Sequence, residues 1–280
     1  MACYTEGMDG ILVINKPAGM TSHDVIGKLR RKYRQKKFGH TGTLDPNASG
    51  VLVVLAGRAA KLLQFLPDTD KEYIAGIELG KKTSTDDIWG DVLEEKPVST
   101  DFDFEEVLQS FKGKQHQRVP DTSAKKVDGR KLMDYQRKNE EVPAVYADVT
   151  IYDIEPISTE DLTFKVDCSS GTYVRSICRD FGEKTGNMAC MKSLVRTRAG
   201  GYTLDQAEDL EAETHTLYPM ESVLDLPRID WPKKSDILNG RHIHMDNQPD
   251  LVSIFCDGQL MAVYERDHNN VYSCKRGLWA

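Results

Sequence analysis

The sequence contains no long run of apolar residues. In its 280 residues the longest such run is Val51 to Ala56, far short of the roughly 20 residues that a membrane-spanning helix needs. Residues 1–7 also lack the basic segment and apolar core of a signal peptide. We therefore expect a cytoplasmic protein with no membrane partner. Its 39% hydrophobic residues are enough for a substantial core.

Paired cysteines are also lacking. The six cysteines are scattered without a Cys-x-x-Cys pair and are Cys3, Cys168, Cys178, Cys190, Cys256 and Cys274. This spacing favours neither a zinc site nor a disulfide framework. His242 and His244 share one strand face, but two histidines alone do not define a metal site. We expect reduced, mostly buried thiols and no metal.

An overall excess of positive charge is absent, because 44 acidic residues outweigh 37 basic ones and the net charge is −7. The basic residues nevertheless gather in two segments. Seven of the ten residues from Lys28 to Lys37 are Lys or Arg, and Lys112 to Lys138 holds nine basic residues against three aspartates, a local net of +6. Two such clusters in an acidic chain favour a polyanion-binding surface. The candidate contact residues are Arg30, Arg31, Lys32, Lys125 and Lys126.

Hydrophobic spacing predicts strands interspersed with helices. Strands are expected at 10–14, 51–55, 71–80, 144–154, 162–168 and 191–195. Helices are expected after a Ser22 cap, at 60–66, 101–111, 132–138 and 172–182, and from Thr203. Sparse apolar residues at about 112–141 indicate an extended, mobile, basic insertion. We predict an α+β domain at 1–225 and a small β-rich domain at 226–280, where turn residues separate short strands.

The stretch from Gly39 to Leu52 places three glycines, a proline and one carboxylate between a basic helix and an apolar strand. Pro46 pushes Asp45 out of the α region and cannot itself donate a backbone hydrogen bond. Taken alone, this pattern is typical of a surface turn in which Asp45 caps the next backbone amides.

Several separated blocks make the chain resemble the TruB family of tRNA pseudouridine synthases. The blocks are Gly10–Ser22, Gly39–Leu52, Lys71–Tyr73, Cys168–Arg175 and Leu194–Arg196, and they cover roughly residues 8 to 225 in the family's order. Two departures fall in the basic insertion, where Val119 replaces a proline and Met133 stands where a tyrosine is usual. Residues 226–280 are similar in outline to the family's small C-terminal domain, which is related to PUA modules.

The resemblance implies an enzyme that isomerises uridine 55 in the T-loop of tRNA. It implies a mixed, largely antiparallel sheet with flanking helices. Asp45 would be the catalytic carboxylate, and attack on the sugar C1′, addition to the uracil C6 or removal of a sugar proton all remain open for it. Tyr73 would stack against the flipped uracil and serve in proton transfer, and Arg175 would orient Asp45 through a bidentate contact.

The same resemblance assigns the remaining site residues. Tyr173 and Leu194 would form the wall of the pocket, and His40 would fill the space that a flipped base leaves. Lys16 either supports the site or extends along a strand end towards solvent. Isomerisation within one nucleotide needs neither a metal nor a cofactor, so we expect none. Asp87 is expected to order its own loop. The expected partner is the T-arm of tRNA, bound by a monomer.

Two other functions fit parts of this pattern. One is an RNA-binding or tRNA-folding protein without catalysis, against which the joint presence of Asp45, Tyr73 and Arg175 argues. The other is a glycosidase or nucleosidase that releases free base, which the mass of the product would distinguish.

Overall fold

A large mixed sheet forms the body of the protein. The computed structural model describes residues 7–67, 69–138 and 140–279. The strands of this sheet are β1 (Gly10–Lys16), β2 (Phe38–His40), β3 (Ser49–Ala56), β4 (Lys71–Leu79), β7 (Gly113–Arg118), β10 (Tyr146–Ser158), β11 (Thr163–Cys168), β12 (Ala189–Ala199), β13 (Tyr202–Thr203) and β14 (Glu208–Asp209).

The order of these strands confirms the expected fold class. The main path runs β14-β1-β3-β12-β4-β11-β10-β7, with β2 beside β3 and β13 beside β12. Among the described residues the pairs are antiparallel except β1 with β14 and β3 with β12. The chain is therefore an α+β protein with a mixed, largely antiparallel sheet. None of the described helices is both long and apolar enough to cross a membrane.

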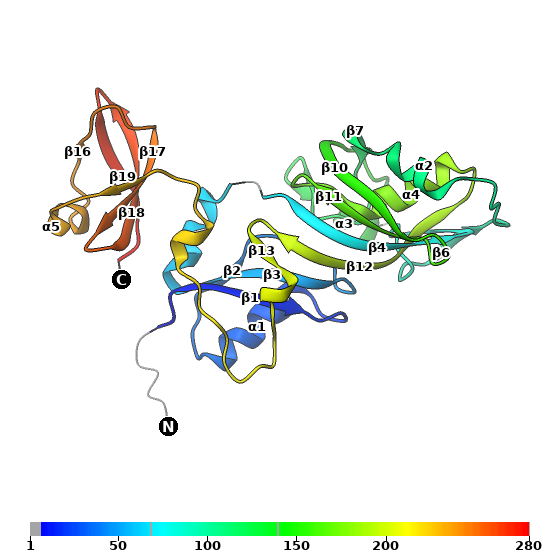
Figure 1. Ribbon diagram of the computed structural model, residues 1–280, viewed down its shortest axis with the longest axis horizontal. Coiled ribbons are helices and arrows are strands. Elements are labelled where there is room, and N and C mark those ends of the chain that lie inside the picture. The colour runs from blue at the N-terminus through cyan, green and yellow to red at the C-terminus, as the bar shows by residue number, and fades with distance from the viewer. Residues whose placement is uncertain (1–6, 68, 139, 280) are drawn as a thin grey trace.

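Helices and 3-10 turns accompany the strands. They are α1 (Ser22–Lys32), α2 (Phe104–Gln109), α3 (Leu132–Arg137), α4 (Val174–Lys184) and α5 (Lys234–Leu238), with 3-10 turns η1 (Gly57–Phe65), η2 (Leu204–Gln206) and η3 (Met220–Val223). Among them α1, α2 and α4 pack against the main sheet. Figure 1 shows α1 beside β1 and β3, whereas α2 and α4 lie towards the other end, beside β10 and β11. Thr21, not Ser22, is the N-cap of α1, because its hydroxyl accepts from the Asp24 N–H.

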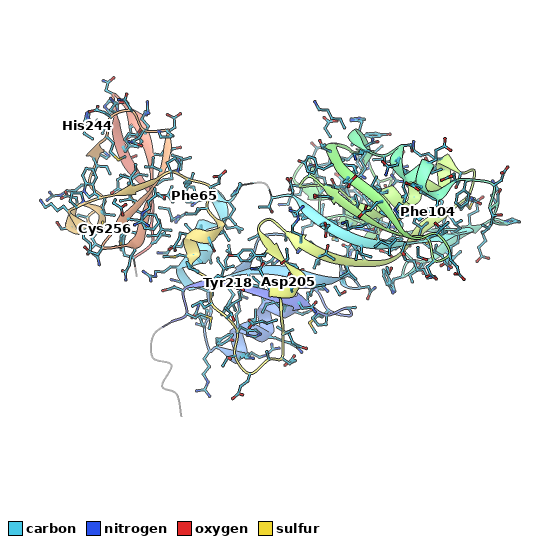
Figure 2. All side chains as sticks on the ribbon, viewed as in Figure 1. Phe65, Phe104, Asp205, Tyr218, His244 and Cys256 are labelled. Carbon is cyan, nitrogen blue, oxygen red and sulfur yellow. The ribbon has the colours of Figure 1, made fainter. Side chains whose placement is uncertain are left out.

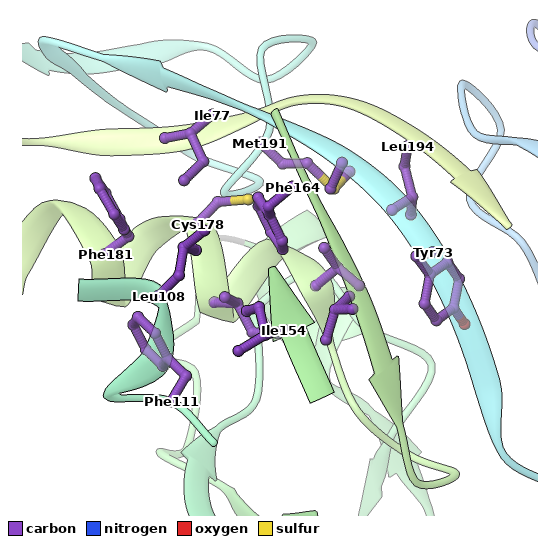
Figure 3. Packing of buried hydrophobic residues seen from close by; sticks show 14 of the residues in the cluster. Tyr73, Ile77, Leu108, Phe111, Ile154, Phe164, Cys178, Phe181, Met191 and Leu194 are labelled. Carbon is purple, nitrogen blue, oxygen red and sulfur yellow. The ribbon is translucent and has the colours of Figure 1, made fainter. Parts of the chain in front are cut away.

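Two apolar clusters position the site between them. One packs α1, through Val25, Ile26 and Leu29, against β1 and β3. The other packs α2 and α4 against β4, β11 and β12, and Figure 3 shows Tyr73 and Leu194 at the end of this cluster away from Phe111 and Phe181. The two residues thus stand where the apolar core meets the Asp45 loop.

A second sheet follows the first along the chain. Its order is β15 (Arg228–Asp230), β17 (Leu251–Cys256), β18 (Gln259–His268), β19 (Val271–Gly277) and β16 (Ile243–His244). It stands to one side of the main sheet, with Phe65 between the two (Figures 1 and 2). Phe255 and Leu278 share an apolar cluster with Ile11 and Val53 of the main sheet. The C-terminal sheet is therefore packed onto the main domain through an apolar cluster that includes residues of both sheets and of η1.

Several predicted elements differ from those in the structure. The segment predicted as an extended, mobile, basic insertion begins with strand β7, which pairs with β10 from Arg118–Tyr146 to Gly113–Ile151. The sequence of β7 shows no apolar alternation, and the one residue that it buries, Gln117, is polar. The helix expected at 60–66 is the 3-10 turn η1, and the one expected from Thr203 is the short turn η2. Two small hairpins, β5 (Lys81–Thr83) with β6 (Val92–Glu95) and β8 (Lys126–Val127) with β9 (Arg130–Lys131), were not predicted.

The thiols match the expectation where the structure describes them. Four described cysteines, Cys168, Cys178, Cys190 and Cys256, are buried and free, and Cys274 is half-buried and free. Cys3 lies outside the described residues.

Candidate active site

The Asp45 loop connects β2 to β3 and is held by the residues around α1. The Leu44 N–H donates to the Ser22 Oγ at 2.9 Å, and the Gly19 N–H donates to the Pro46 carbonyl at 2.9 Å. These bonds fix the backbone on both sides of Asp45. The turn pattern alone predicted that the Asp45 carboxylate caps the next backbone amides. In the structure the Ala48 N–H donates instead to the main-chain oxygen of Asp45.

Lys16 supports the same loop from beneath. Its side chain is fully buried, and its Nζ donates to the carbonyls of Pro17, Met20 and Pro46 at 2.9, 2.7 and 3.0 Å. Burial lowers the pKa of Lys16 to about 8, although the nearby Asp45 charge opposes this shift. Lys16 is absent from the residues that line the cleft. Of the two roles considered for Lys16, the geometry therefore favours support of the site.

Arg196 holds the other end of the loop, and its role was missed in the sequence. This buried side chain on β12 donates to the Val51 carbonyl at 2.7 Å and to the Gly42 and Thr43 carbonyls at 3.1 and 3.3 Å. Gly50 lets β3 approach it, because a Cβ there would lie 2.2 Å from the Arg196 carbonyl and the φ of Gly50 is +106°. The Leu194–Arg196 block contained this signal, but only Leu194 was singled out.

The Asp45 carboxylate pairs with Arg175, as expected from the resemblance. Arg175 Nε lies 3.1 Å from Asp45 Oδ2, with 7% of the arginine side chain and 39% of the aspartate side chain exposed. The predicted bidentate contact is wrong, because Nη1 donates to the Thr85 carbonyl and the Thr122 Oγ1, and Nη2 donates to the Thr122 carbonyl. Asp45 Oδ1 makes no hydrogen bond within the part of the chain that the structure describes.

A cleft of about 690 Å³ opens in front of this ion pair. Tyr73, Leu194 and Val174 form apolar parts of its lining, and Tyr73 is only 8% exposed. Burial raises the pKa of Tyr73, so its phenol keeps its proton at neutral pH. The cleft thus places a carboxylate, a protonated phenol and apolar walls around one space.

Tyr173 also lines the cleft, and Gln117 on β7 fixes its backbone. The Tyr173 N–H donates to Gln117 Oε1 at 2.8 Å, and Gln117 Nε2 donates back to the Tyr173 carbonyl at 3.1 Å. Tyr173 is the N-cap of α4, whose second residue is Arg175. The sequence did not indicate a role for Gln117, because Gln117 reaches Tyr173 only through the pairing of β7 with β10.

The basic insertion contributes one rim of the cleft. Lys125, Arg137 and Met133 line it, and Lys126 is exposed on the neighbouring strand β8. Met133, which departs from the family pattern, thus stands in the cleft itself. Positive charge from the insertion therefore borders the space in front of Asp45.

The basic residues of α1 do not line this cleft. Arg30 donates to the Phe38 carbonyl at 3.1 Å, Lys32 donates to the Ala212 carbonyl, and Arg31 is exposed. Lys28 pairs with Glu211 at 2.6 Å. The acidic segment after η2 therefore neutralises part of the basic helix that the sequence suggested as a polyanion surface.

His40 lies at the end of β2, one residue before Thr41, which lines the cleft. Its Nδ1 is buried and has no hydrogen-bond partner among the described residues. Burial lowers the pKa of His40, and the charge of Arg196 adds to this effect. The neutral ring is therefore favoured at pH 7.

Asp87 orders its own loop. Its Oδ1 accepts from the Thr85 hydroxyl at 2.6 Å and from the Trp89 N–H at 3.1 Å. The same loop presents the Thr85 carbonyl to Arg175.

Comparison with solved structures defines the class of this fold. The chain resembles a protein in an H/ACA ribonucleoprotein bound to a substrate RNA containing 2′-deoxyuridine, with a TM-score of 0.68, 23% identity, and coverage of 97% of this chain and 85% of that one. A Cbf5-Nop10-Gar1 complex gives the same values. These likenesses show that the chain shares its fold with a protein of these complexes.

Sequence comparison then identifies the family. Residues 30–174 match the family described as TruB family pseudouridylate synthase (N terminal domain). The chain is 40% identical to tRNA pseudouridine synthase B of Bacillus subtilis (strain 168), over 92% of this chain and 93% of that protein. It is 39% identical to the enzyme of the same name from Alkaliphilus oremlandii (strain OhILAs), over 95% and 96%. This chain belongs to the TruB family of pseudouridylate synthases.

Proposed function

We propose that this chain converts uridine 55 in the T-loop of tRNA to pseudouridine. The Asp45–Arg175 ion pair carries this proposal, because it stands at the head of a cleft lined by Tyr73 and Leu194 in a TruB-family chain. The relatives named tRNA pseudouridine synthase B support tRNA as the substrate.

The reaction rearranges one nucleotide without net loss of atoms. The bond between uracil N1 and the sugar C1′ breaks, a bond between C5 and C1′ forms, C5 loses a proton and N1 gains one. Asp45 acts as the nucleophile or base of this sequence. Arg175 orients its Oδ2 and leaves Oδ1 available to the substrate. The protonated Tyr73 hydroxyl is suited to proton transfer beside the uracil.

The uridine has to leave the stacked T-loop to enter the cleft, at a cost of a few kcal/mol. Tyr173 and Leu194 provide walls against which the extruded base packs. The neutral His40 ring fills the space that the base leaves, and Lys125 and Lys126 contact the phosphates. Arg30, Arg31 and Lys32 make outer contacts, and Lys16 acts through the loop that it supports.

The organisation of the chain follows the same proposal. Residues 1–225 form the catalytic domain, with the basic RNA-binding insertion at about 112–141, and residues 226–280 form a small PUA-like domain. The protein acts as a monomer in the cytoplasm, on the T-arm of tRNA. Its residues perform the isomerisation without a metal or cofactor.

Substitution of Asp45 by asparagine tests the proposal directly. Asp45→Asn keeps the shape of the side chain but removes the charge, so we expect pseudouridine formation on a T-arm transcript to fall below detection. Asp148→Asn is the matched control, because its carboxylate is exposed and pairs with His116 outside the cleft. Full activity of Asp45→Asn would overturn the assigned chemistry.

The mass of the product separates the competing functions. An isomerase leaves the mass of the RNA unchanged, whereas a glycosidase releases uracil and leaves an abasic site. A tRNA-folding protein binds the transcript and leaves every uridine unmodified. Mass spectrometry combined with mapping of modified positions therefore distinguishes all three.

A further inference from the structure

Arg175 joins three separate segments of the protein. Its Nε contacts Asp45 of the catalytic loop at 3.1 Å. Its Nη1 contacts the Thr85 carbonyl at 2.8 Å and the Thr122 Oγ1 at 3.0 Å, and its Nη2 contacts the Thr122 carbonyl at 3.2 Å. Because a guanidinium is planar and rigid, the position of one edge fixes the direction of the other. The orientation of Nε towards Asp45 therefore depends on Thr122.

Thr122 belongs to the basic insertion, which also borders the cleft. Its neighbour Ser123 is buried, and the Ser123 carbonyl accepts from the Met133 N–H at 3.2 Å. Lys125 and Met133 line the cleft together with Thr122. An RNA that enters the cleft thus meets the same segment that holds Arg175.

The Thr85 and Thr122 segments, which accept hydrogen bonds from the guanidinium, are also joined to each other. Gln136 Nε2 in α3 donates to the Ser84 carbonyl at 3.0 Å, one residue before Thr85. The arginine side chain is 7% exposed, so water does not readily replace a lost partner. Water therefore compensates little for the loss of a Thr122 hydrogen bond, and the change affects the ion pair.

We propose that Thr122 is a positioning residue for the isomerase, which couples the basic insertion to the Asp45–Arg175 pair. Its hydroxyl and carbonyl hold the Nη edge of Arg175, and this sets the angle at which Nε meets the Asp45 carboxylate. The inference rests on the proposed function. It predicts that Thr122 affects the rate of the chemical step more than the binding of RNA.

Thr122→Val tests this role, because valine keeps the shape of threonine and removes the Oγ1 acceptor. We expect the single-turnover rate of pseudouridine formation on a T-arm transcript to fall about tenfold, since a hydrogen bond to a charged donor is lost. The dissociation constant of the RNA should change less than twofold. Thr122→Ser, which restores the hydroxyl, should recover most of the rate.

The matched control is Thr185→Val at the other end of α4. That hydroxyl donates to the Phe181 carbonyl at 3.0 Å and lies outside the cleft lining. We expect the control to leave the rate unchanged. Thermal unfolding of all variants separates loss of fold from loss of positioning, and Thr122→Ala repeats the loss of the hydroxyl should valine destabilise the insertion.

A double-mutant cycle with Arg175→Lys distinguishes positioning from a general structural effect. Lysine has no Nη edge, so Thr122→Val should have no further effect in that background. An equal loss in both backgrounds, an unimpaired Thr122→Val, or a failure of serine to restore the rate would overturn the inference. An active wild type with unimpaired variants refutes only the role of Thr122, whereas an inactive wild type refutes the proposed function and this inference with it.

Discussion

Replacement of Lys16 by methionine removes the ammonium that supports the Asp45 loop and keeps a side chain of similar length. Three hydrogen bonds are lost, to the carbonyls of Pro17, Met20 and Pro46. Of these, the Pro46 carbonyl retains the Gly19 N–H as a donor. The variant therefore removes the Lys16 donor from the Pro17 and Met20 carbonyls as well as from Pro46.

The size of the effect follows from two opposing contributions. Hydrogen bonds from a charged donor contribute about 1.5–3 kcal/mol each. Against this, the Lys16 pKa is lowered from 10.5 to about 8 because burial outweighs the nearby Asp45 charge, and this shift corresponds to a net cost of about 3 kcal/mol for the charged form. The net destabilisation expected for Lys16→Met at pH 7 is about 2–5 kcal/mol, a fall in melting temperature of roughly 5–15 °C.

The effect should also depend on pH in a defined direction. Below pH 8 Lys16 carries its proton in both the folded and the unfolded chain, so it adds no pH dependence. Between about pH 8 and 10.5 the unfolded chain binds the extra proton, and the stability of the wild type should gain up to about 1.4 kcal/mol per pH unit from this group. Lys16→Met lacks this gain, so the difference between the two proteins should widen as pH rises through this window.

Calorimetry of both proteins between pH 6 and pH 10.5 measures these differences, and single-turnover assays show whether loosening of the Pro46 carbonyl lowers the rate. Lys114→Met is the control, because Lys114 is exposed on β7, and we expect its melting temperature to change by no more than about 2 °C. A melting temperature for Lys16→Met within 2 °C of the wild type at pH 7 would refute the supporting role of the ammonium. A difference that stays constant from pH 7 to pH 10 would refute the lowered pKa of Lys16.

Three other substitutions probe the remaining parts of the site. Gly50→Ala should destabilise the fold by roughly 3 kcal/mol or more, because φ is +106° and the new Cβ meets the Arg196 carbonyl, and denaturant unfolding measures this loss. Tyr73→Phe should lower the single-turnover rate by about 100-fold or more while the melting temperature stays within a few degrees, and a rate within threefold of the wild type would exclude proton transfer by the hydroxyl. Lys125→Gln should weaken tRNA binding and reduce its salt slope by about 0.7 to 1, whereas an unchanged slope in binding titrations would remove this residue from the phosphate contacts.

The sequence was informative where the determinants are local. The alternation around Tyr73 and the apolar run before Lys16 specify β4 and β1, because an alternating strand buries one face and a continuous apolar strand is buried on both. The ordered blocks around Asp45 and Arg175 gave the resemblance to the family, and this resemblance implied the ion pair.

Contacts between distant segments were decided by the tertiary structure. Strand β7 has no apolar pattern and exists because its backbone pairs with β10, which in turn brings Gln117 to Tyr173. Another such contact joins Lys32 to the Ala212 carbonyl, 180 residues further along the chain.

The geometry of the Asp45–Arg175 pair shows the same division. The sequence by itself determined that Asp45 follows a basic helix and precedes an apolar strand, and its resemblance to the family implied Arg175 as the partner. Only the tertiary structure showed that Arg196 anchors the loop and that Thr122 occupies the Nη edge of Arg175, which leaves a single contact to Asp45. The physical reason is that a guanidinium satisfies whichever buried acceptors surround it, and these acceptors are brought together by folding.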